Sequence, residues 1–459
     1  MCIITAACLA EACSSYPAAG SIYYWAFRSW GGGKAGRFIS FLVAAWTLVA
    51  WTAFLASDSF GVANYLISEV VAFNPHTSFP YETSDVRARA VAWILSLLFL
   101  AIATSLNFLP PRMYSWVFRA GVTVIIIDML LNFIWLPIGV SQTYGFQTAE
   151  FVFTSEYNGG NTSPGLNWVL SWFMVGSCLV GQDASGHVAE ETVSAKKAAA
   201  KGIFWATVAS ALCGFPVIIL FLFCMPPIET FYSTNVPQPF INMYAMALGP
   251  HAHVVATIVA MIGAILNTSI SLVAVSRLVF AVARDGVFPF SDVLSRVSKS
   301  KQPHNAVIFI STIAALLLCT QLPSQVAFSS LISTSAAGSL AAYGLVGIGR
   351  AFITRKTFRP GFWDLGRFGV AAAVVTFLWN GFAFAVLCAP TYSNSEIDAD
   401  SSLFNYAIVI MGGVTIIAMA EWWRKSNDIW FTHLKFVDSD TETSHSGREE
   451  QIEPPTNAV

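Results

Sequence analysis

Four ionisable side chains stand in otherwise apolar stretches of this sequence, and they are its strongest candidates for chemistry. They are Glu11, Asp58, Asp128 and Asp183. A charge inside a lipid bilayer is costly, so such groups usually face a cavity or one another and mark a path for ions or solutes. Uncharged amides in similar stretches add to this polar set: Asn107, Asn132, Asn267 and Asn380. The chemistry they suggest is the binding and passage of a polar solute.

Asp183 is the most informative of the four because of its neighbours. It stands in the segment 179–187, which reads Leu-Val-Gly-Gln-Asp-Ala-Ser-Gly-His. Gly181 and Gly186 weaken a helix there, and serine and aspartate side chains compete for backbone hydrogen bonds. A helix broken inside the bilayer presents free N–H and C=O groups and two half-helix dipoles, which bind charged substrates. The alternative is that Asp183 and His187 cap a helix at its cytoplasmic end.

The other three acids have less specific surroundings. Asn132 follows Asp128 by one helical turn on the same face, which suits a structural hydrogen bond between helices. Asp58 is expected near the outer end of a span, where water can solvate it. Glu11 fits either a proton site or an anchor for helix packing, and the anchor is favoured.

The elements that position these residues follow from composition. Hydrophobic residues make up 55% of the 459 residues and charged residues only 11%, and mean hydropathy is +0.62. Soluble domains carry about 25% charged residues, so lipid is the solvent that suits this chain. The net charge of −2 gives no indication of nucleic-acid binding.

A bilayer core about 30 Å thick needs about 20 apolar residues per helix, and lipid offers no partner for an open strand edge. The sequence therefore predicts an all-α, polytopic membrane protein. Eleven candidate spans occur at 1–27, 38–67, 90–109, 116–138, 167–187, 202–225, 252–283, 305–320, 325–348, 368–389 and 402–423. The segment 252–283 is long enough to continue past the membrane as a helix.

The distribution of basic residues predicts the orientation. If the loop 28–37 is cytoplasmic, 22 of the 24 Lys and Arg lie on that side, and only Arg87 and Arg89 lie opposite. The N-terminus is then outside and the C-terminus cytoplasmic. Residues 1–423 form the membrane domain, and 424–459 form an acidic cytoplasmic tail that is expected to be disordered.

Cysteine, histidine, tryptophan and small residues add further constraints. The eight cysteines form no CxxC pair and the seven histidines form no cluster, so neither a metal site, a cofactor nor an intramembrane enzyme is expected. Trp46, Trp51 and Trp172 lie within spans and are candidates for pocket walls. Small residues concentrate at 333–344, where either close helix packing or a flexible substrate wall explains them.

Four stretches, three of them with a second part close by, are similar to one known family. They are Leu9-Ala10-Glu11 with 16–25, 181–187 with 190–192, Ser276-Arg277 with 283–289, and Pro303-His304-Asn305 at the start of a span. Together they resemble the amino acid–polyamine–organocation permeases, nearest to the fungal GABA and choline permeases. The resemblance covers about residues 1–425.

The resemblance implies a LeuT-like fold of twelve helices, the first ten in two inverted five-helix repeats. It implies alternating-access transport of an amino acid, GABA, choline or a related amine, with a coupled proton or by exchange. The plasma membrane is the family's usual location, and the vacuolar membrane is the alternative. The family's first helix, which holds a substrate carboxylate, is expected to be absent from this chain, in agreement with eleven spans. The alternative expectation is a truncated chain that does not transport.

The resemblance also assigns candidate substrate-binding residues. The family's broken sixth helix falls on 177–183, which contains Ser177, Cys178, Gly181 and Asp183. The eighth helix contributes Asn267 and Ser271, and the third contributes Trp46. Two departures, Gln182 in place of a common aromatic residue and Gly20-Ser21 in place of a frequent Gly-Gly pair, leave the substrate open.

Overall fold

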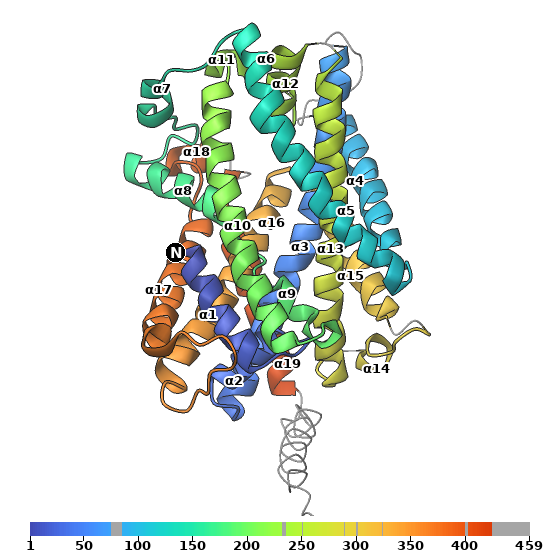
Figure 1. Cartoon of the computed structure of the whole chain (residues 1–459), viewed down its shortest axis with the longest axis vertical. Coiled ribbons are helices and arrows are strands. Elements are labelled where there is room, and N and C mark those ends of the chain that lie inside the picture. The colour runs from blue at the N-terminus through green and yellow to red at the C-terminus, as the bar shows by residue number, and fades with distance from the viewer. Residues whose placement is uncertain are drawn as a thin grey trace, which may run out of the picture.

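The helix α3 (Lys34–Phe73) runs through the middle of the molecule and packs against helices from both halves of the chain (Figure 1). With 40 residues it is about 60 Å long at about 1.5 Å per residue, roughly twice the thickness of a bilayer core. The structure is a computed structural model that describes residues 1–74, 85–231, 236–249, 251–288, 290–299, 302–323, 325–399 and 403–424. Within these ranges the side chains of 173–177, 325–327, 329 and 399 are not described.

The described residues are helical and contain no β-strand, which confirms the predicted all-α class. The helices of the first half are α1 (Cys2–Ser15), α2 (Ile22–Ser29), α4 (Val86–Leu106), α5 (Pro111–Leu130), the π-helix η1 (Leu131–Trp135), α6 (Leu136–Gln142), α7 (Ala149–Thr154), α8 (Pro164–Ser177), α9 (Ala184–His187), η2 (Ala189–Glu191) and α10 (Ala195–Cys224). Those of the second half are α11 (Ile228–Phe231), α12 (Phe240–Leu248), α13 (His253–Arg284), α14 (Ser291–Leu294), α15 (His304–Leu318), η3 (Cys319–Gln321), α16 (Gln325–Ile348), η4 (Gly349–Ile353), η5 (Gly366–Phe368), α17 (Gly369–Leu387), α18 (Asn394–Ala399) and α19 (Ala407–Arg424).

Nine helices in the described part of the chain are long and apolar enough to cross a membrane, and they match nine of the eleven predicted spans. The two remaining spans are each divided into two shorter helices. Segment 1–27 forms α1 and α2, and segment 167–187 forms α8 and α9. The long segment 252–283 is one continuous helix, as predicted. The total of eleven spans and the inverted repeat stay predictions.

Two apolar cores hold the bundle together. One joins α1, α10, α16 and α17 around buried side chains such as Trp25 and Tyr343. The other joins α3, α13 and α15, with Leu55, Leu272 and Ile310 at its centre. The candidate site lies where these two groups of helices face each other.

Glu11 serves as the expected packing anchor. Its carboxylate is 1% exposed and lies 3.2 Å from Nε of Arg350, which also stands 4.1 Å from the centre of the Phe358 ring. The Leu365 N–H donates to the other carboxylate oxygen at 3.2 Å. The buried carboxylate is thus paired and hydrogen-bonded, as a charge in a low-dielectric interior must be.

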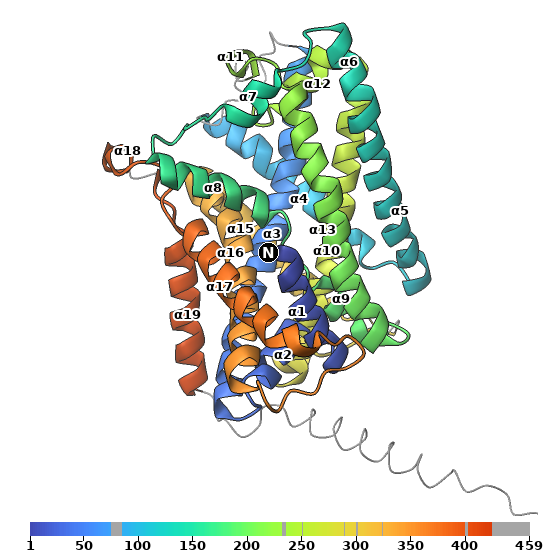
Figure 2. The same cartoon turned by 60° about the vertical axis from the view of Figure 1, so that its left-hand side comes forward.

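The two ends of the bundle differ in their charges. Figures 1 and 2 show α2 and α9 towards one end, and α6, α11 and α12 at the other. Helix ends near α2 and α9 carry Lys34, Lys197, Arg284 and Arg350, so we call this the basic end. Which membrane side the basic end faces stays a prediction. The predicted acidic tail lies almost entirely outside the described residues.

Close packing explains Gly338, one of the small residues of 333–344, where α16 crosses α3. A Cβ atom built on Gly338 would lie 2.7 Å from the Trp46 carbonyl oxygen and 3.0 Å from the Ala50 Cβ. We therefore expect Gly338→Ala to force the helices apart and cost about 1–3 kcal/mol of stability, the usual penalty for overpacking. The thermal unfolding midpoint of the detergent-purified protein measures this.

The matched control for that substitution is Gly412→Ala in α19. A Cβ atom at Gly412 meets no heavy atom within 4 Å, and alanine is a better helix former than glycine by about 1 kcal/mol. The control should unfold at the same temperature as the wild type or slightly above it. Equal losses in both variants would contradict the packing argument.

Candidate functional site

The non-helical stretch between α8 and α9, which we call the break, forms the centre of the candidate site. α8 ends at Ser177 and α9 begins at Ala184, so the residues between them are not helical. Gly181 has φ +87°, a left-handed conformation that side chains disfavour, and a Cβ there would lie 3.4 Å from the Trp51 ring. The break predicted from Gly181 and Gly186 is therefore present. Its backbone leaves the helical hydrogen-bond ladder inside the bundle.

A cavity of about 340 Å³ lies beside this break. Its walls come from α3, the break and the start of α9, α13 and α16: Ala50, Trp51, Phe54, Cys178, Val180, Gly181, Ala184, Asn267, Ile270, Ser271, Ser335, Ala336 and Ser339. Small-molecule sites are concave and mostly apolar, with a few polar groups that fix the ligand's orientation. This cavity has that character, and its volume suits a small organic molecule.

The structure brings four of the seven predicted site residues together around the cavity: Cys178, Gly181, Asn267 and Ser271. Trp46 lies elsewhere, because its indole N–H donates to the Thr415 hydroxyl of α19 at 2.9 Å. The wall from α3 is formed by Trp51 and Phe54 instead. The Ser177 side chain is outside the described part of the structure.

Asp183 lies behind the cavity wall and is fully buried. The Tyr343 hydroxyl donates to its Oδ1 at 2.5 Å, and Oδ2 lies 3.0 Å from Nε2 of His187. The same Tyr343 hydroxyl accepts the Gly181 N–H at 3.2 Å. One hydroxyl thus ties both the break and its buried acid to α16. Neither of the two interpretations of Asp183 from sequence included this contact.

His187 extends this network toward the basic end. Its other ring nitrogen, Nδ1, lies 3.2 Å from the Ala19 carbonyl oxygen, in the turn between α1 and α2. The Ser21 hydroxyl in that turn donates to the Asp183 carbonyl oxygen at 3.2 Å. The packing is tight, because a Cβ on Gly186 would lie 2.8 Å from the Trp25 ring. The break is therefore held by Tyr343 of α16 on one side and by the turn between α1 and α2 on the other.

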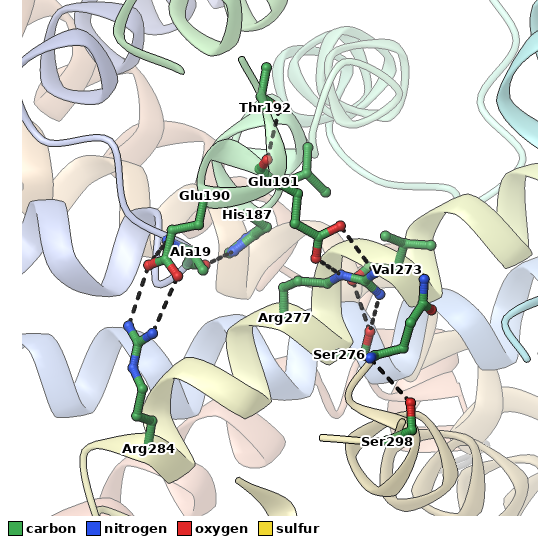
Figure 3. Close-up of polar contacts among 12 residues, drawn as sticks. Ala19, His187, Glu190, Glu191, Thr192, Val273, Ser276, Arg277, Arg284 and Ser298 are labelled. Atoms are coloured by element: carbon green, nitrogen blue, oxygen red, sulfur yellow. Dashed lines mark hydrogen bonds and ion pairs between the residues drawn. The ribbon is translucent and has the colours of Figure 1, made fainter. Parts of the chain in front are cut away.

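Two ion pairs join η2 to α13 (Figure 3). Arg277 of α13 pairs with Glu191 at 3.0 Å, and Arg284 pairs with Glu190 at 3.2 Å. Glu190 also accepts the Ala19 N–H at 2.9 Å. Arg277 is largely buried, whereas the Glu191 side chain is 54% exposed. The pairs join η2, which follows the break, to the helix that forms the opposite cavity wall.

Asp58 lies on the other side of the cavity, away from the basic end. It was expected to be solvated near the end of its span, but the structure places it half-buried between α3 and α13. Its Oδ2 accepts hydrogen bonds from the Thr268 hydroxyl at 2.8 Å and from the Asn267 amide at 3.2 Å. Asn267 lines the cavity, so this hydrogen bond links Asp58 to the cavity wall. The sequence contained no signal that joined Asp58 to 267–268.

Comparison with known proteins places the chain among transporters. The family model described as amino acid permease matches residues 1–414. The chain is 44% identical to the thiamine transporter thi9 of Schizosaccharomyces pombe, over 98% of this chain and 79% of that protein. It is 28% identical to the amino-acid permease BAT1 homolog of Oryza sativa (92% and 81%) and 27% identical to the GABA-specific permease of Saccharomyces cerevisiae (89% and 71%). The chain therefore belongs to the amino acid permease family of integral membrane transporters.

Proposed function

We propose that the protein is a secondary active transporter that moves a small organic solute with a positively charged nitrogen across the plasma membrane. Thiamine is the first candidate substrate, because a thiamine transporter is 44% identical over 98% of the chain. Amino acids, GABA, choline and related amines form the wider class, because amino-acid and GABA permeases are also relatives. A coupled proton drives uptake in this proposal.

The cavity at the helix break is the observation that carries the proposal. It combines aromatic faces from α3 with backbone groups of the break and polar side chains of α13 and α16. Aromatic faces attract cationic nitrogen by about 0.5–2 kcal/mol, and the exposed ends of a broken helix bind charged groups. The substrate in this proposal lies between Trp51, Gly181 and Ser271.

Alternating access needs a closed gate on one side of that cavity, and we assign this gate to the ion pairs at the basic end. Arg277 and Arg284 stand on α13, whereas Glu190 and Glu191 follow the break. One helix group contains α13 and the other contains the break. Rocking of one group against the other would separate the four side chains and open the cavity toward the basic end. The basic end is cytoplasmic in this proposal, in keeping with the positive-inside rule.

Uptake measurements test the proposal directly. The full chain is expressed in a yeast strain that lacks its own thiamine and amine carriers, and uptake of labelled thiamine, GABA, choline and a neutral amino acid is measured. Saturable thiamine uptake that an uncoupler abolishes is the expected result. The variant Trp51→Ala removes one aromatic wall and should raise KM at least tenfold. Absence of uptake of every substrate by a chain that reaches the cell surface would refute the proposal.

A further inference from the structure

The inference concerns Asp58 and rests on the function proposed above. On α3, Trp51, Phe54 and Asp58 are spaced three, four and seven residues apart, so they share one face of the helix. Trp51 and Phe54 line the cavity. Asp58 follows one turn further from the basic end and holds the cavity residue Asn267 by a 3.2 Å hydrogen bond. The carboxylate therefore contacts a lining residue of this cavity, although Asp58 is not itself one of the lining residues.

The Asp58 carboxylate has only neutral partners among the described residues. Thr268 and Asn267 both donate their hydrogen bonds to Oδ2 of Asp58. Among the described residues no donor is hydrogen-bonded to Oδ1. Three other described acids in the bundle have a base at hydrogen-bond distance: Glu11 has Arg350, Glu69 has His253 and Asp183 has His187. A half-buried carboxylate without a counter-charge is costly. A cation that enters the cavity would supply one.

A second acid without an ion pair stands in the bundle. It is Asp128 of α5, a helix that packs against α13 as α3 does. The described structure gives neither acid an ion pair, and the two arginines of the gate, Arg277 and Arg284, stand at the basic end. A solute that approaches from the opposite end therefore meets carboxylates before it meets any arginine of the gate.

The aromatic wall suits the same kind of ligand. The Trp51 and Phe54 rings pack edge to face with centroids 6.1 Å apart. Both rings are among the lining residues of the cavity. The cavity thus offers aromatic faces from α3, and the Asp58 carboxylate is hydrogen-bonded to the lining residue Asn267.

We infer that Asp58 is the counter-charge for the positively charged nitrogen of the substrate, and that it makes the site select organic cations over uncharged molecules of the same shape. Asn267 and Thr268 position the carboxylate through Oδ2, which leaves Oδ1 for the substrate. Trp51 and Phe54 enclose the charged group from the side of α3. Substrates without a positive charge lose this interaction and bind weakly.

The test compares thiamine with an uncharged analogue in which a thiophene ring replaces the thiazolium. Inhibition constants of both compounds against labelled thiamine uptake are measured for the wild type, Asp58→Asn and Asp58→Glu. The wild type should prefer the cation at least tenfold. Asp58→Asn, which keeps the shape and an acceptor for Thr268, should lower this ratio severalfold, to the preference that the aromatic walls alone give. Asp58→Glu should keep most of the ratio.

The matched control is Glu150→Gln on the exposed helix α7, which removes one negative charge far from the cavity and should leave the ratio unchanged. A wild type that binds the neutral analogue as tightly as thiamine overturns the inference whatever the variants do. An Asp58→Asn variant that keeps the full cation preference also overturns it. Lack of any uptake by the wild type would instead contradict the proposed function.

Discussion

Replacement of Asp183 by alanine is expected to abolish uptake and to destabilise the protein. The substitution removes the acceptor of the Tyr343 hydroxyl and the partner of the His187 ring. All three side chains are buried. A buried polar group left without its partner costs about 1–3 kcal/mol, so two such groups remove a large part of the usual 5–15 kcal/mol of stability.

The effect on transport should be larger than the loss of stability alone. Tyr343 holds the Gly181 N–H as well as Asp183, so the break loses its connection to α16 when the carboxylate is removed. The backbone groups that face the cavity would then no longer be fixed. Uptake rate per molecule at the cell surface, together with the thermal unfolding midpoint in detergent, separates the two effects.

Asp183→Asn is the matched variant. Its side-chain oxygen can still accept from Tyr343, and its amide can donate to an unprotonated His187 nitrogen. We expect it to fold nearly as well as the wild type and to keep measurable uptake. Tyr343→Phe should resemble Asp183→Ala more closely, because it breaks the bond to Gly181 too. Full uptake by Asp183→Ala would show that the network has no part in transport.

The sequence predicted the helices well because lipid imposes a simple rule on them. Long apolar segments must form helices that cross the bilayer, and nine of these were placed correctly. The break in 167–187 was predictable too, since Gly181 and Gly186 stand in an otherwise apolar span. The division of 1–27 into α1 and α2 was not predicted, although Pro17 and Gly20 lie between them.

Which face of each helix points toward the cavity could not be predicted from the sequence. This explains why Trp46, a predicted site residue, does not line the cavity. Trp46 and Trp51 are five residues apart, which turns the side chain about 140° around the helix axis at 3.6 residues per turn. α3 is apolar on all sides, so its sequence has no polar face from which to choose between them. The structure turns Trp46 toward α19 and Trp51 toward the cavity.

Contacts between residues distant in sequence could not be predicted for a similar reason. Asp183 was singled out, but its partner Tyr343 lies 160 residues later in a run of small residues. Asp58 meets Thr268 across 210 residues. Neither pairing follows from composition or spacing, because both depend on how two apolar helices cross. The identity of the substrate depends on such contacts.

Reversal of the charge of Arg277 is expected to open the basic end of the transporter. In Arg277→Glu, two carboxylates face each other where a 3.0 Å ion pair stood. The ion pair between Arg284 and Glu190 remains. Both of its side chains are partly exposed, and exposed pairs contribute only about 0.2–1 kcal/mol. Hydrogen bonds to a charged, largely buried group contribute about 1.5–3 kcal/mol. Loss of the Arg277–Glu191 pair should therefore shift the equilibrium between the state closed at the basic end and the state open there by at least tenfold, because each 1.4 kcal/mol changes an equilibrium constant tenfold.

Cys178 reports this shift without an added label site, because its thiol lines the cavity. In inside-out vesicles, a membrane-impermeant thiol reagent reaches Cys178 only through the basic end, if that end is cytoplasmic. Modification of Cys178, measured by peptide mass spectrometry, should be at least ten times faster in Arg277→Glu than in the wild type. Modification from the other side should become slower, because the two openings alternate.

Two variants decide whether the ion pair itself is responsible. Arg277→Glu combined with Glu191→Arg restores the pair in reverse and should return modification of Cys178 toward the wild-type rate. Arg424→Gln removes a basic residue that pairs with Glu421 within the single helix α19, so it should change nothing. If the charge-swapped protein stays as reactive as Arg277→Glu, the cavity is closed by packing around α9 and not by these charges. A normal rate in Arg277→Glu would mean that Arg284 and Glu190 suffice to hold the gate.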